Sequence, residues 1–152
     1  MMTAEGAKVL EFNVRLGDPE TQPLMHRMAS DFVPALMAAA EGRLAGTTLE
    51  WQAGPSVCVV LASAGYPGAY ETGKAITGLA AAEAKGATVF QAGTRHLHGQ
   101  LETSGGRVLG VTASGADLGE AIAVAYEGVS HIRFEGMHYR RDIGAKGLTR
   151  GR

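Results

Sequence analysis

The sequence predicts an α+β chain in two parts. Residues 1–50 are expected to hold one strand followed by helices, and residues 56–148 a small β-rich module with one helix. Apolar and polar residues alternate from Val9 to Leu16, which is typical of a strand with one buried face. Helix-start patterns follow, and in the second part short runs rich in β-branched residues are separated by glycines. We place the boundary between Ala45 and Pro55.

Length and charge narrow the class of protein. At 152 residues the chain is long enough to bury a core. Its 14 basic residues nearly balance its 15 acidic ones, so charge gives no reason to expect nucleic acid or an anionic membrane as a partner. There is no apolar run near the ~18 residues of a membrane helix and no signal-like N-terminus, so we expect a cytoplasmic protein.

The first predicted strand separates two kinds of side chain, because successive side chains of a strand point to opposite faces. The face expected to pack inward carries Leu10, Phe12, Val14 and Leu16. The opposite face carries Glu11, Asn13 and Arg15. Carboxylate and amide oxygens suit Mg²⁺, and a guanidinium binds phosphate or carboxylate through two parallel hydrogen bonds. This face indicates a site for metal, phosphate and an anionic substrate, and the alternative is a sheet whose outer face is merely polar.

Two helices are expected after this strand. Asp18 is a suitable N-cap and Pro19 a suitable first helical residue. This first helix would turn three apolar residues toward a core, namely Leu24, Met25 and Met28. A second helix would begin at Ser30, carry Pro34 near its first turn and end near Gly42.

Short strands dominate the second part. The expected strands are Val57 to Ser63, Ala75 to Gly78, Thr88 to Ala92, Gln100 to Thr103 and Arg107 to Ala113. Ser104, Gly105 and Gly106 form a hairpin signal between the last two. A helix is predicted from Asp117 to about Val129, with an apolar stripe of Leu118, Ile122, Ala125 and Val129. The single cysteine, Cys58, is expected to be buried in the first of these strands.

Several blocks of the sequence occur in an order and spacing that resemble one protein family. The first block is LEFNVRLGDPETQP at residues 10–23. The later blocks are Ser30-Asp31, Val59 to Ser63 with Gly65 to Gly68, Ile76 to Leu79, Val89 to Thr94, Gly105 to Ala113, and Tyr139 to Gly144. Together they resemble the C-terminal portion of the phosphoribosylamine-glycine ligases, or glycinamide ribonucleotide synthetases, of the ATP-grasp superfamily.

The resemblance implies an architecture for both parts. Residues 1–50 would be the C-terminal end of an ATP-grasp domain. Residues 56–148 would be the family's C-terminal domain, similar to that of biotin carboxylase, a rudimentary barrel-sandwich. Family members carry an N-terminal α/β domain and most of the ATP-grasp domain before this point. The chain is therefore expected to be a fragment, a reading frame begun at an internal methionine, or one half of a split enzyme.

The resemblance also implies roles for individual residues. Glu11 and Asn13 would bind Mg²⁺ or Mn²⁺, and Arg15 would act in catalysis on phosphate or the substrate carboxylate, a structural ion pair being the alternative. Asp18 would contact the amine of glycine, cap the helix, or do both. Arg140 and Arg141 would bind the sugar phosphate, unless they belong to a solvated turn.

The implied reaction is ATP-dependent ligation of glycine to 5-phosphoribosylamine through a glycyl phosphate, a step of purine biosynthesis. The residues that hold ATP would lie mostly outside this chain, so we expect the isolated chain to be inactive. Two other readings stay open. The chain is a non-catalytic scaffold that docks onto a separate ATP-grasp chain, or it is part of a different ATP-grasp carboxylate ligase.

Overall fold

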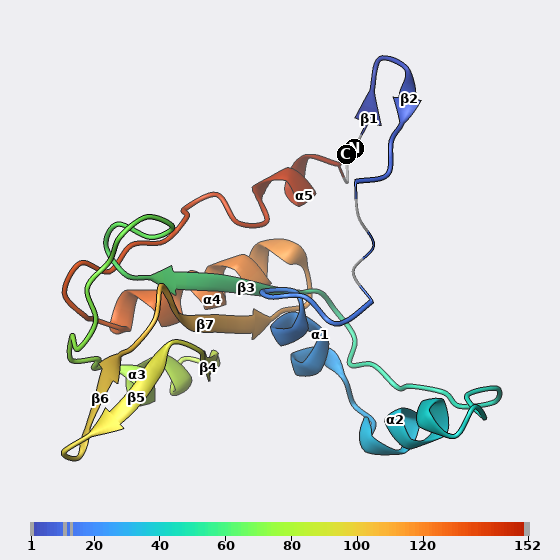
Figure 1. The fold of residues 1–152 in the computed structure, drawn as a ribbon, viewed down its shortest axis with the longest axis horizontal. Coiled ribbons are helices and arrows are strands. Elements are labelled where there is room, and N and C mark those ends of the chain that lie inside the picture. The colour runs from blue at the N-terminus through green and yellow to red at the C-terminus, as the bar shows by residue number, and fades with distance from the viewer. Residues whose placement is uncertain (1, 11, 13, 151–152) are drawn as a thin grey trace.

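An antiparallel three-stranded sheet with the order β3, β7, β4 forms the centre of the chain (Figure 1). These strands span Ser56–Ala62, Arg107–Ser114 and Thr88–Gln91. The computed structural model describes residues 2–10, 12 and 14–150. The fold is thus mixed α/β with antiparallel sheets, and the predictions for these three strands are confirmed to within one residue at each end.

The remaining elements lie around this sheet. Two small antiparallel pairs consist of β1 (Met2–Thr3) with β2 (Gly6–Ala7), and β5 (Thr94–Leu97) with β6 (Gln100–Thr103). The helices are α1 (Thr21–Arg27), α2 (Val33–Ala40), α3 (Leu79–Glu83), α4 (Leu118–His131) and α5 (Ala145–Arg150). Figure 1 shows β1 and β2 projecting from the body of the molecule, with the lobe containing α2 at another corner. None of the described helices is long and apolar enough to cross a membrane.

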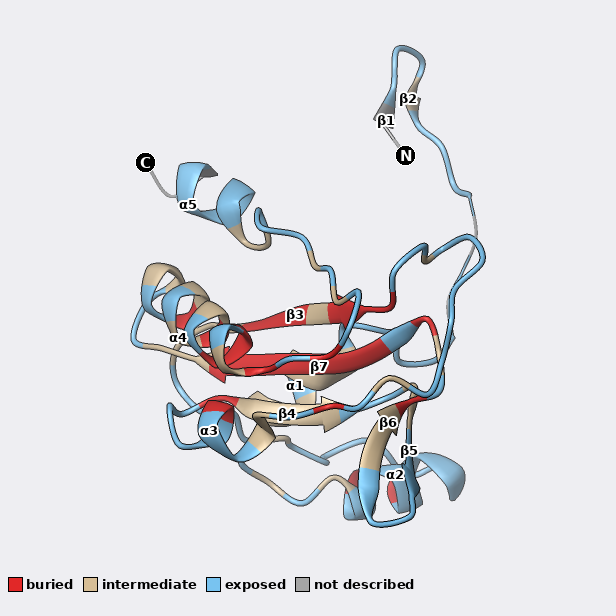
Figure 2. Cartoon of the chain, turned by 90° about the vertical axis from the view of Figure 1, so that its left-hand side faces the viewer, coloured by how far each residue is buried: buried red, intermediate tan, exposed pale blue. Residues whose placement is uncertain are grey.

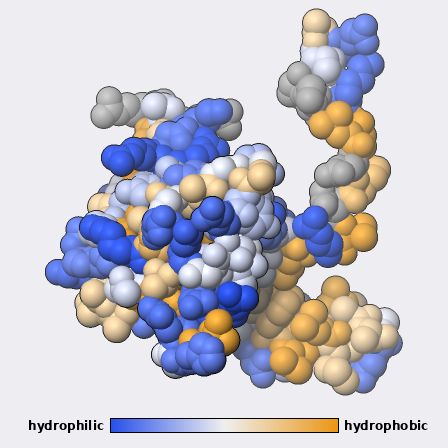
Figure 3. All heavy atoms as spheres, turned by 60° about the vertical axis from the view of Figure 1, so that its left-hand side comes forward, coloured by the Kyte–Doolittle hydropathy of each residue, from blue (hydrophilic) through white to orange (hydrophobic). Residues whose placement is uncertain are grey.

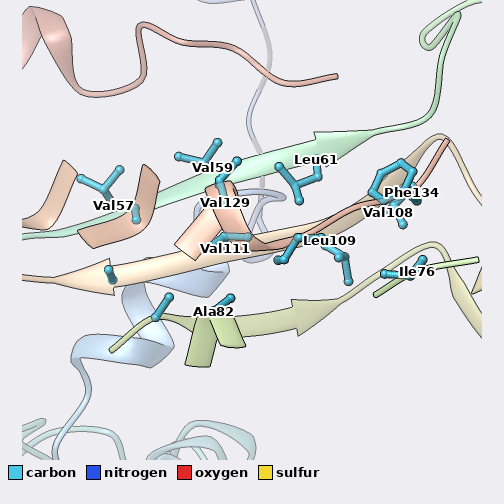
Figure 4. Close-up of a cluster of buried hydrophobic side chains, with 14 of the residues drawn as sticks. Val57, Val59, Leu61, Ile76, Ala82, Val108, Leu109, Val111, Val129 and Phe134 are labelled. Carbon is cyan, nitrogen blue, oxygen red and sulfur yellow. The ribbon is translucent and has the colours of Figure 1, made fainter. Parts of the chain in front are cut away.

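The hydrophobic core lies between the sheet and α4. Val59 on β3 pairs with Val111 on β7, and both are fully buried (Figure 4). Helix α4 approaches closely because Gly128 faces the sheet, where a Cβ would lie 2.7 Å from the Cβ of Ala87 and 3.1 Å from Cγ1 of Val111. Figure 2 shows that the buried residues concentrate on β3, β7 and α4.

Helix α4 begins as the sequence predicts. The Asp117 side chain accepts a hydrogen bond from the Glu120 N–H at 2.9 Å, and the Glu120 carboxylate accepts from the Ala116 N–H at 2.7 Å. The first bond satisfies a donor that the first helical turn leaves without an intrahelical partner, and the second holds the residue before the N-cap. The predicted stripe also holds, since Ala125 and Val129 are buried against the sheet.

The other face of the sheet is covered by α1, which contacts β3 and β7. Gly110 makes room for this helix, because a Cβ there would lie 3.1 Å from Sγ of Cys58 and 3.6 Å from Cγ of Gln22. Cys58 is buried, as predicted, and burial raises the pKa of its thiol.

The hairpin predicted at Ser104 to Gly106 is wrong. Strand β6 pairs with β5, whereas β7 pairs with β3 and β4. The Ser104 N–H donates to the Gly93 carbonyl at 2.7 Å, and the backbones of Gly93 and Gly105 pass so closely that a Cβ on Gly105 would lie 3.0 Å from Cα of Gly93. The three residues thus carry the chain from one sheet to another.

The predicted strand at Ala75 to Gly78 is reduced to two isolated bridges. Ala75 pairs with Glu102 and Thr77 with Arg133, so this stretch alternates between two different neighbours. Helix α3 follows directly and, like β5 and α5, it was not predicted from the sequence. All three are short, and short elements depend on tertiary packing more than on local pattern.

The predicted strand from Val9 to Leu16 is also wrong for the part of it that the structure describes. Its described residues form no strand, and its apolar side chains are exposed, with Val9 72%, Leu10 71%, Phe12 83% and Val14 96% accessible. A strand needs a neighbour for its N–H and C=O groups, and no described segment pairs with this one. Figure 2 shows the described residues of this stretch as exposed.

The two predicted helices form with shifted starts. Asp18 does not cap α1; the N-cap is Glu20, and the Thr21 N–H bonds the Gly17 carbonyl at 3.0 Å. Helix α2 carries Pro34 in its first turn as predicted, but it begins at Val33. The Asp31 side chain accepts from the Val33 N–H at 2.9 Å, which keeps Ser30 and Asp31 outside the helix.

Candidate functional site

A pocket of about 390 Å³ lies on the face of β3 that points away from α4. Its floor is formed by alternate β3 residues, because their neighbours point into the core. Segments distant in the sequence form its walls. The lining residues are Pro19, Cys58, Val60, Ala62, Tyr66, Pro67, Arg107, His138, Tyr139, Arg140 and Ile143.

The position of the Tyr66 ring in the pocket wall requires glycine at position 106. A Cβ on Gly106 would collide with the Tyr66 ring and would lie 3.0 Å from the Tyr70 ring. The two rings make an edge contact with centroids 6.2 Å apart. Ser63 holds the same corner, since its N–H donates to the Gly106 carbonyl and its hydroxyl to the Gly105 carbonyl, each at 2.9 Å. The loop after β3 is therefore fixed against the start of β7.

Arg107 joins this pocket to the turn before α1. Its Nε lies 3.4 Å from Oδ2 of Asp18, and its Nη1 donates to the Asp18 carbonyl oxygen at 3.2 Å. Asp18 was predicted as a site residue, and the structure places it beside a pocket-lining cation. No role for Arg107 was predicted from the sequence.

One wall of the pocket, formed by the segment from His138 to Ile143, is hydrogen-bonded to the end of β3. The N–H of His138 donates to the Ala62 carbonyl at 3.0 Å, and the His138 carbonyl accepts from the Ala62 N–H at 2.9 Å. Arg140 lines the pocket, and its guanidinium donates two hydrogen bonds to Asp142, at 2.9 and 2.7 Å. This pair lowers the pKa of Asp142 and raises that of Arg140.

The structure separates the two predicted arginines of this segment. Arg141 does not line the pocket; its guanidinium carbon lies 5.6 Å from the centroid of the Tyr139 ring, a cation–π geometry. Arg140 alone of the two faces the cavity. Nothing in the spacing of the sequence distinguishes these two neighbours.

Of the three site residues predicted on the first strand, the structure describes Arg15. Glu11 and Asn13 lie outside the described residues. Arg15 is exposed, and its guanidinium donates to the carbonyl of its neighbour Leu16 at 3.3 Å. Within the described residues, no group of three or more His, Cys, Asp and Glu side chains could hold a metal ion.

Several pocket residues have no role predicted from the sequence. Tyr66 and Arg107 fall inside blocks that carry the family resemblance, which is the one signal that could have selected them. His138 carries no spacing signature at all. The contact of Arg107 with Asp18 spans 89 positions, and no local pattern encodes it.

A second pocket, of about 470 Å³, lies between the loop after β3 and the segment after α4. Lys74 bridges its walls, with Nζ 2.9 Å from Glu71 and 3.4 Å from Glu135. These carboxylates raise the pKa of Lys74, and Lys74 lowers that of Glu71. The lysine is thus already neutralised by side chains of the chain itself.

Comparison with known proteins places the chain among relatives of one kind. The family described as "Phosphoribosylglycinamide synthetase, C domain" matches residues 56–146. A phosphoribosylamine–glycine ligase of Synechocystis sp. is 54% identical over 142 residues, covering 93% of this chain and 34% of the relative. A phosphoribosylamine–glycine ligase of Allochromatium vinosum is 51% identical over 153 residues, covering 100% of this chain and 36% of the relative.

A solved structure agrees with these relatives. The crystal structure of phosphoribosylamine–glycine ligase from Thermotoga maritima superposes with a TM-score of 0.79 at 39% identity, covering 93% of this chain and 34% of that one. The chain thus spans about a third of the length of the relatives that it matches. With the family match covering most of the chain and the fold shared, this chain belongs to the phosphoribosylglycinamide synthetase C-domain family.

Proposed function

We propose that this chain is the C-terminal part of a phosphoribosylamine–glycine ligase. One observation carries the proposal: relatives of that name align with 93% and 100% of the chain at 54% and 51% identity, across both the N-terminal segment and the C domain. The reaction would join glycine to 5-phosphoribosylamine with ATP, through a glycyl phosphate, in cytoplasmic purine biosynthesis. The finer architecture, an ATP-grasp end followed by a biotin carboxylase-like domain, is part of the same proposal.

Glu11 and Asn13 would hold Mg²⁺ or Mn²⁺ in the complete site. The chemistry of the donor set supports this, because a carboxylate and an amide oxygen are hard ligands that leave coordination positions for water and phosphate. When bound, the cation would neutralise charge on the ATP phosphates. Arg15 would act beside them on the transferring phosphoryl group or the glycine carboxylate, and its exposed guanidinium is free of carboxylate partners among the described residues.

Asp18 would bind glycine, and Arg140 would bind the phosphate of 5-phosphoribosylamine. The Asp18 carboxylate contacts Arg107 through Oδ2, and a carboxylate offers about four lone-pair sites, so capacity remains for the ammonium group of glycine. Arg140 would contact the sugar phosphate from the pocket, with Asp142 orienting its guanidinium. Arg141 would contribute to the same phosphate only by leaving the Tyr139 ring.

The exposed apolar surface supports a larger assembly. Figure 3 shows hydrophobic surface along the segment after β2 and on the lobe that contains α2. On α2 the exposed residues include Val33, Leu36 and Met37. Contiguous apolar surface of this kind marks an interaction site. We propose that the remainder of the ATP-grasp domain, in one polypeptide or as a separate chain, covers it and pairs with the segment from Val9 to Leu16. A scaffold role without catalysis is the second candidate.

A chimera tests the function directly. This chain would replace the matching third of the Synechocystis ligase, and ADP release would be measured with ATP, Mg²⁺, glycine and 5-phosphoribosylamine, omitting each in turn. We expect release that requires both glycine and phosphoribosylamine, and no steady release from the isolated chain. Activity with bicarbonate or another carboxylate in place of glycine would contradict the substrate assignment, and an inactive but folded chimera would favour the scaffold role.

Point variants of the chimera test the metal site. Glu11→Gln is expected to lower kcat by at least about a hundredfold, the order seen when a key electrostatic contact at a reacting group is removed. Glu5→Gln is the matched control, because Glu5 is a surface carboxylate paired with Lys8 at 3.1 Å near β1. Equal activity of the two variants would contradict the role of Glu11.

A further inference from the structure

The side chain of Arg107 contacts Asp18 at two places. Nε lies 3.4 Å from the carboxylate Oδ2, and Nη1 donates to the main-chain carbonyl at 3.2 Å. A single ion pair would fix only a distance between two flexible side chains. The added bond to the main chain fixes the backbone of the turn itself relative to the sheet.

The backbone of Arg107 is held on both sides. Arg107 is paired with Ala62 on β3, and its carbonyl accepts a hydrogen bond from the Gly93 N–H at 2.9 Å. The preceding residue, Gly106, accepts from the Ser63 N–H at 2.9 Å. The end of β3 and the segment just after β4 therefore hold the backbone at this point.

The turn that Arg107 contacts, from Gly17 to Thr21, also contains hydrogen bonds between its own residues. Thr21 N–H donates to the Gly17 carbonyl at 3.0 Å, and the Gly17 N–H donates to the Glu20 carboxylate at 3.1 Å. These bonds shape the turn but do not tie it to the sheet. Helix α1, which begins at Thr21, packs on β3 and β7, and the Arg107 contacts add a polar tie at the N-terminal side of the turn. The Asp18 side chain remains 49% exposed, open to a ligand.

We propose that Arg107 is a positioning residue that holds the Asp18 carboxylate where it receives the ammonium group of the amino-acid substrate. The inference rests on the proposed function, in which Asp18 contacts that ammonium. Arg107 itself touches no reacting atom; it acts through Asp18, and links the C-terminal module to the segment that carries Arg15.

Kinetics of the chimera test the proposal. Arg107→Met is expected to raise KM for glycine by about tenfold while kcat stays within about twofold, which is the effect of losing one charge-assisted contact to a substrate. Arg107→Lys keeps the charge and should recover part of the loss. Arg95→Met is the matched control, because Arg95 pairs with Glu102 at the same 3.4 Å on the distant β5–β6 hairpin. Equal KM values for Arg107→Met and Arg95→Met would overturn the proposal.

A second measurement is independent of activity. Hydrogen–deuterium exchange of the amides from Gly17 to Gln22 would be followed in this 152-residue chain. We expect severalfold faster exchange in Arg107→Met and no change in Arg95→Met. Unchanged exchange in Arg107→Met would show that Arg107 does not hold the turn at Asp18. Faster exchange with an unchanged KM for glycine would show that holding this turn does not affect substrate binding. An inactive wild-type chimera would instead count against the proposed function, since the exchange result is obtained without turnover.

Discussion

The hydroxyl of Tyr126 on α4 donates a 2.7 Å hydrogen bond to the carbonyl of Arg140 and accepts one of 3.1 Å from the N–H of Ile143. One side chain thus satisfies two backbone groups of the segment that walls the pocket. Because Arg140 and Ile143 both line that pocket, α4 determines its shape although it packs on the far face of the sheet.

Removing this hydroxyl should loosen the wall. Tyr126→Phe keeps the ring but leaves the Arg140 carbonyl and the Ile143 N–H without this partner, so we expect a loss of about 1 kcal/mol in the free energy of unfolding. Urea denaturation measures it. Tyr70→Phe is the control, because the Tyr70 hydroxyl makes no hydrogen bond within the described part of the chain. Equal stability of the two variants would contradict the role of Tyr126.

Because α4 packs closely on the sheet, adding one methyl group at position 128 should lower the free energy of unfolding. Gly128→Ala would place a Cβ 2.7 Å from the Cβ of Ala87, and overpacking of a buried contact costs about 1–3 kcal/mol. The helix-forming gain of alanine over glycine, about 1 kcal/mol, offsets part of this. We expect a net loss in thermal denaturation, whereas Glu127→Ala on the exposed side should change stability by less than about 0.5 kcal/mol. A stabilised Gly128→Ala variant would show that the helix can shift outward freely.

The Arg140–Asp142 pair predicts a pH dependence with a definite sign. Hydrogen bonds from Arg140 lower the pKa of Asp142 below its ordinary value of 3.8. Its contribution is therefore fully present above pH 3.8 and is lost as the pH falls through the lower folded-state pKa. We expect Asp142→Asn to be less stable than wild type at neutral pH, and the difference to shrink below pH 3.8. A difference that is constant across this range would mean that the carboxylate charge contributes nothing.

Burial of Cys58 predicts slow thiol chemistry. Loss of hydration raises the thiol pKa, and the side chain is covered, so little reactive thiolate is present at neutral pH. Titration with an aromatic disulfide reagent should show almost no release of coloured thiol from the folded chain and one equivalent after unfolding in urea. Rapid reaction of the folded chain would mean that the pocket beside Cys58 admits the reagent.

The exposed segment after β2 predicts dye binding and self-association of the isolated chain. Replacing Leu10, Phe12 and Val14 together by serine should lower the fluorescence of a hydrophobic dye and reduce association measured by light scattering. Leu97→Ser, at an exposed leucine on β5, is the control. If the triple variant binds as much dye as wild type, the α2 lobe rather than this segment is the main apolar surface.

Sequence patterns within one segment correctly predicted the elements that depend mainly on interactions within that segment. The carboxylate of Asp117 and the stripe ending at Val129 were enough to locate α4, and the strand Gln100 to Thr103 was predicted with its observed bounds. The partner of that strand was not, because the two-residue turn of His98 and Gly99, both at positive φ, was not recognised as the hairpin signal that joins β5 to β6.

The site was less predictable than the fold, for a physical reason. Alternation from Val9 to Leu16 describes a strand only where a neighbouring strand exists, and the described residues supply none. Asp18 was selected as a helix cap or, by resemblance, as a contact to the amine of glycine, yet its observed partner is Arg107, a residue on β7. Contacts between segments so far apart depend on the folded topology, and spacing within one segment does not encode them.

The most direct test of the central claim is incorporation of radiolabelled glycine by the chimera. Product would be separated and counted after incubation with ATP, Mg²⁺ and 5-phosphoribosylamine. We expect one labelled glycinamide ribonucleotide for each ADP released, and at least about a hundredfold slower formation of it with Glu11→Gln. ADP release without labelled product, or labelled product formed equally well by Glu11→Gln, would contradict it.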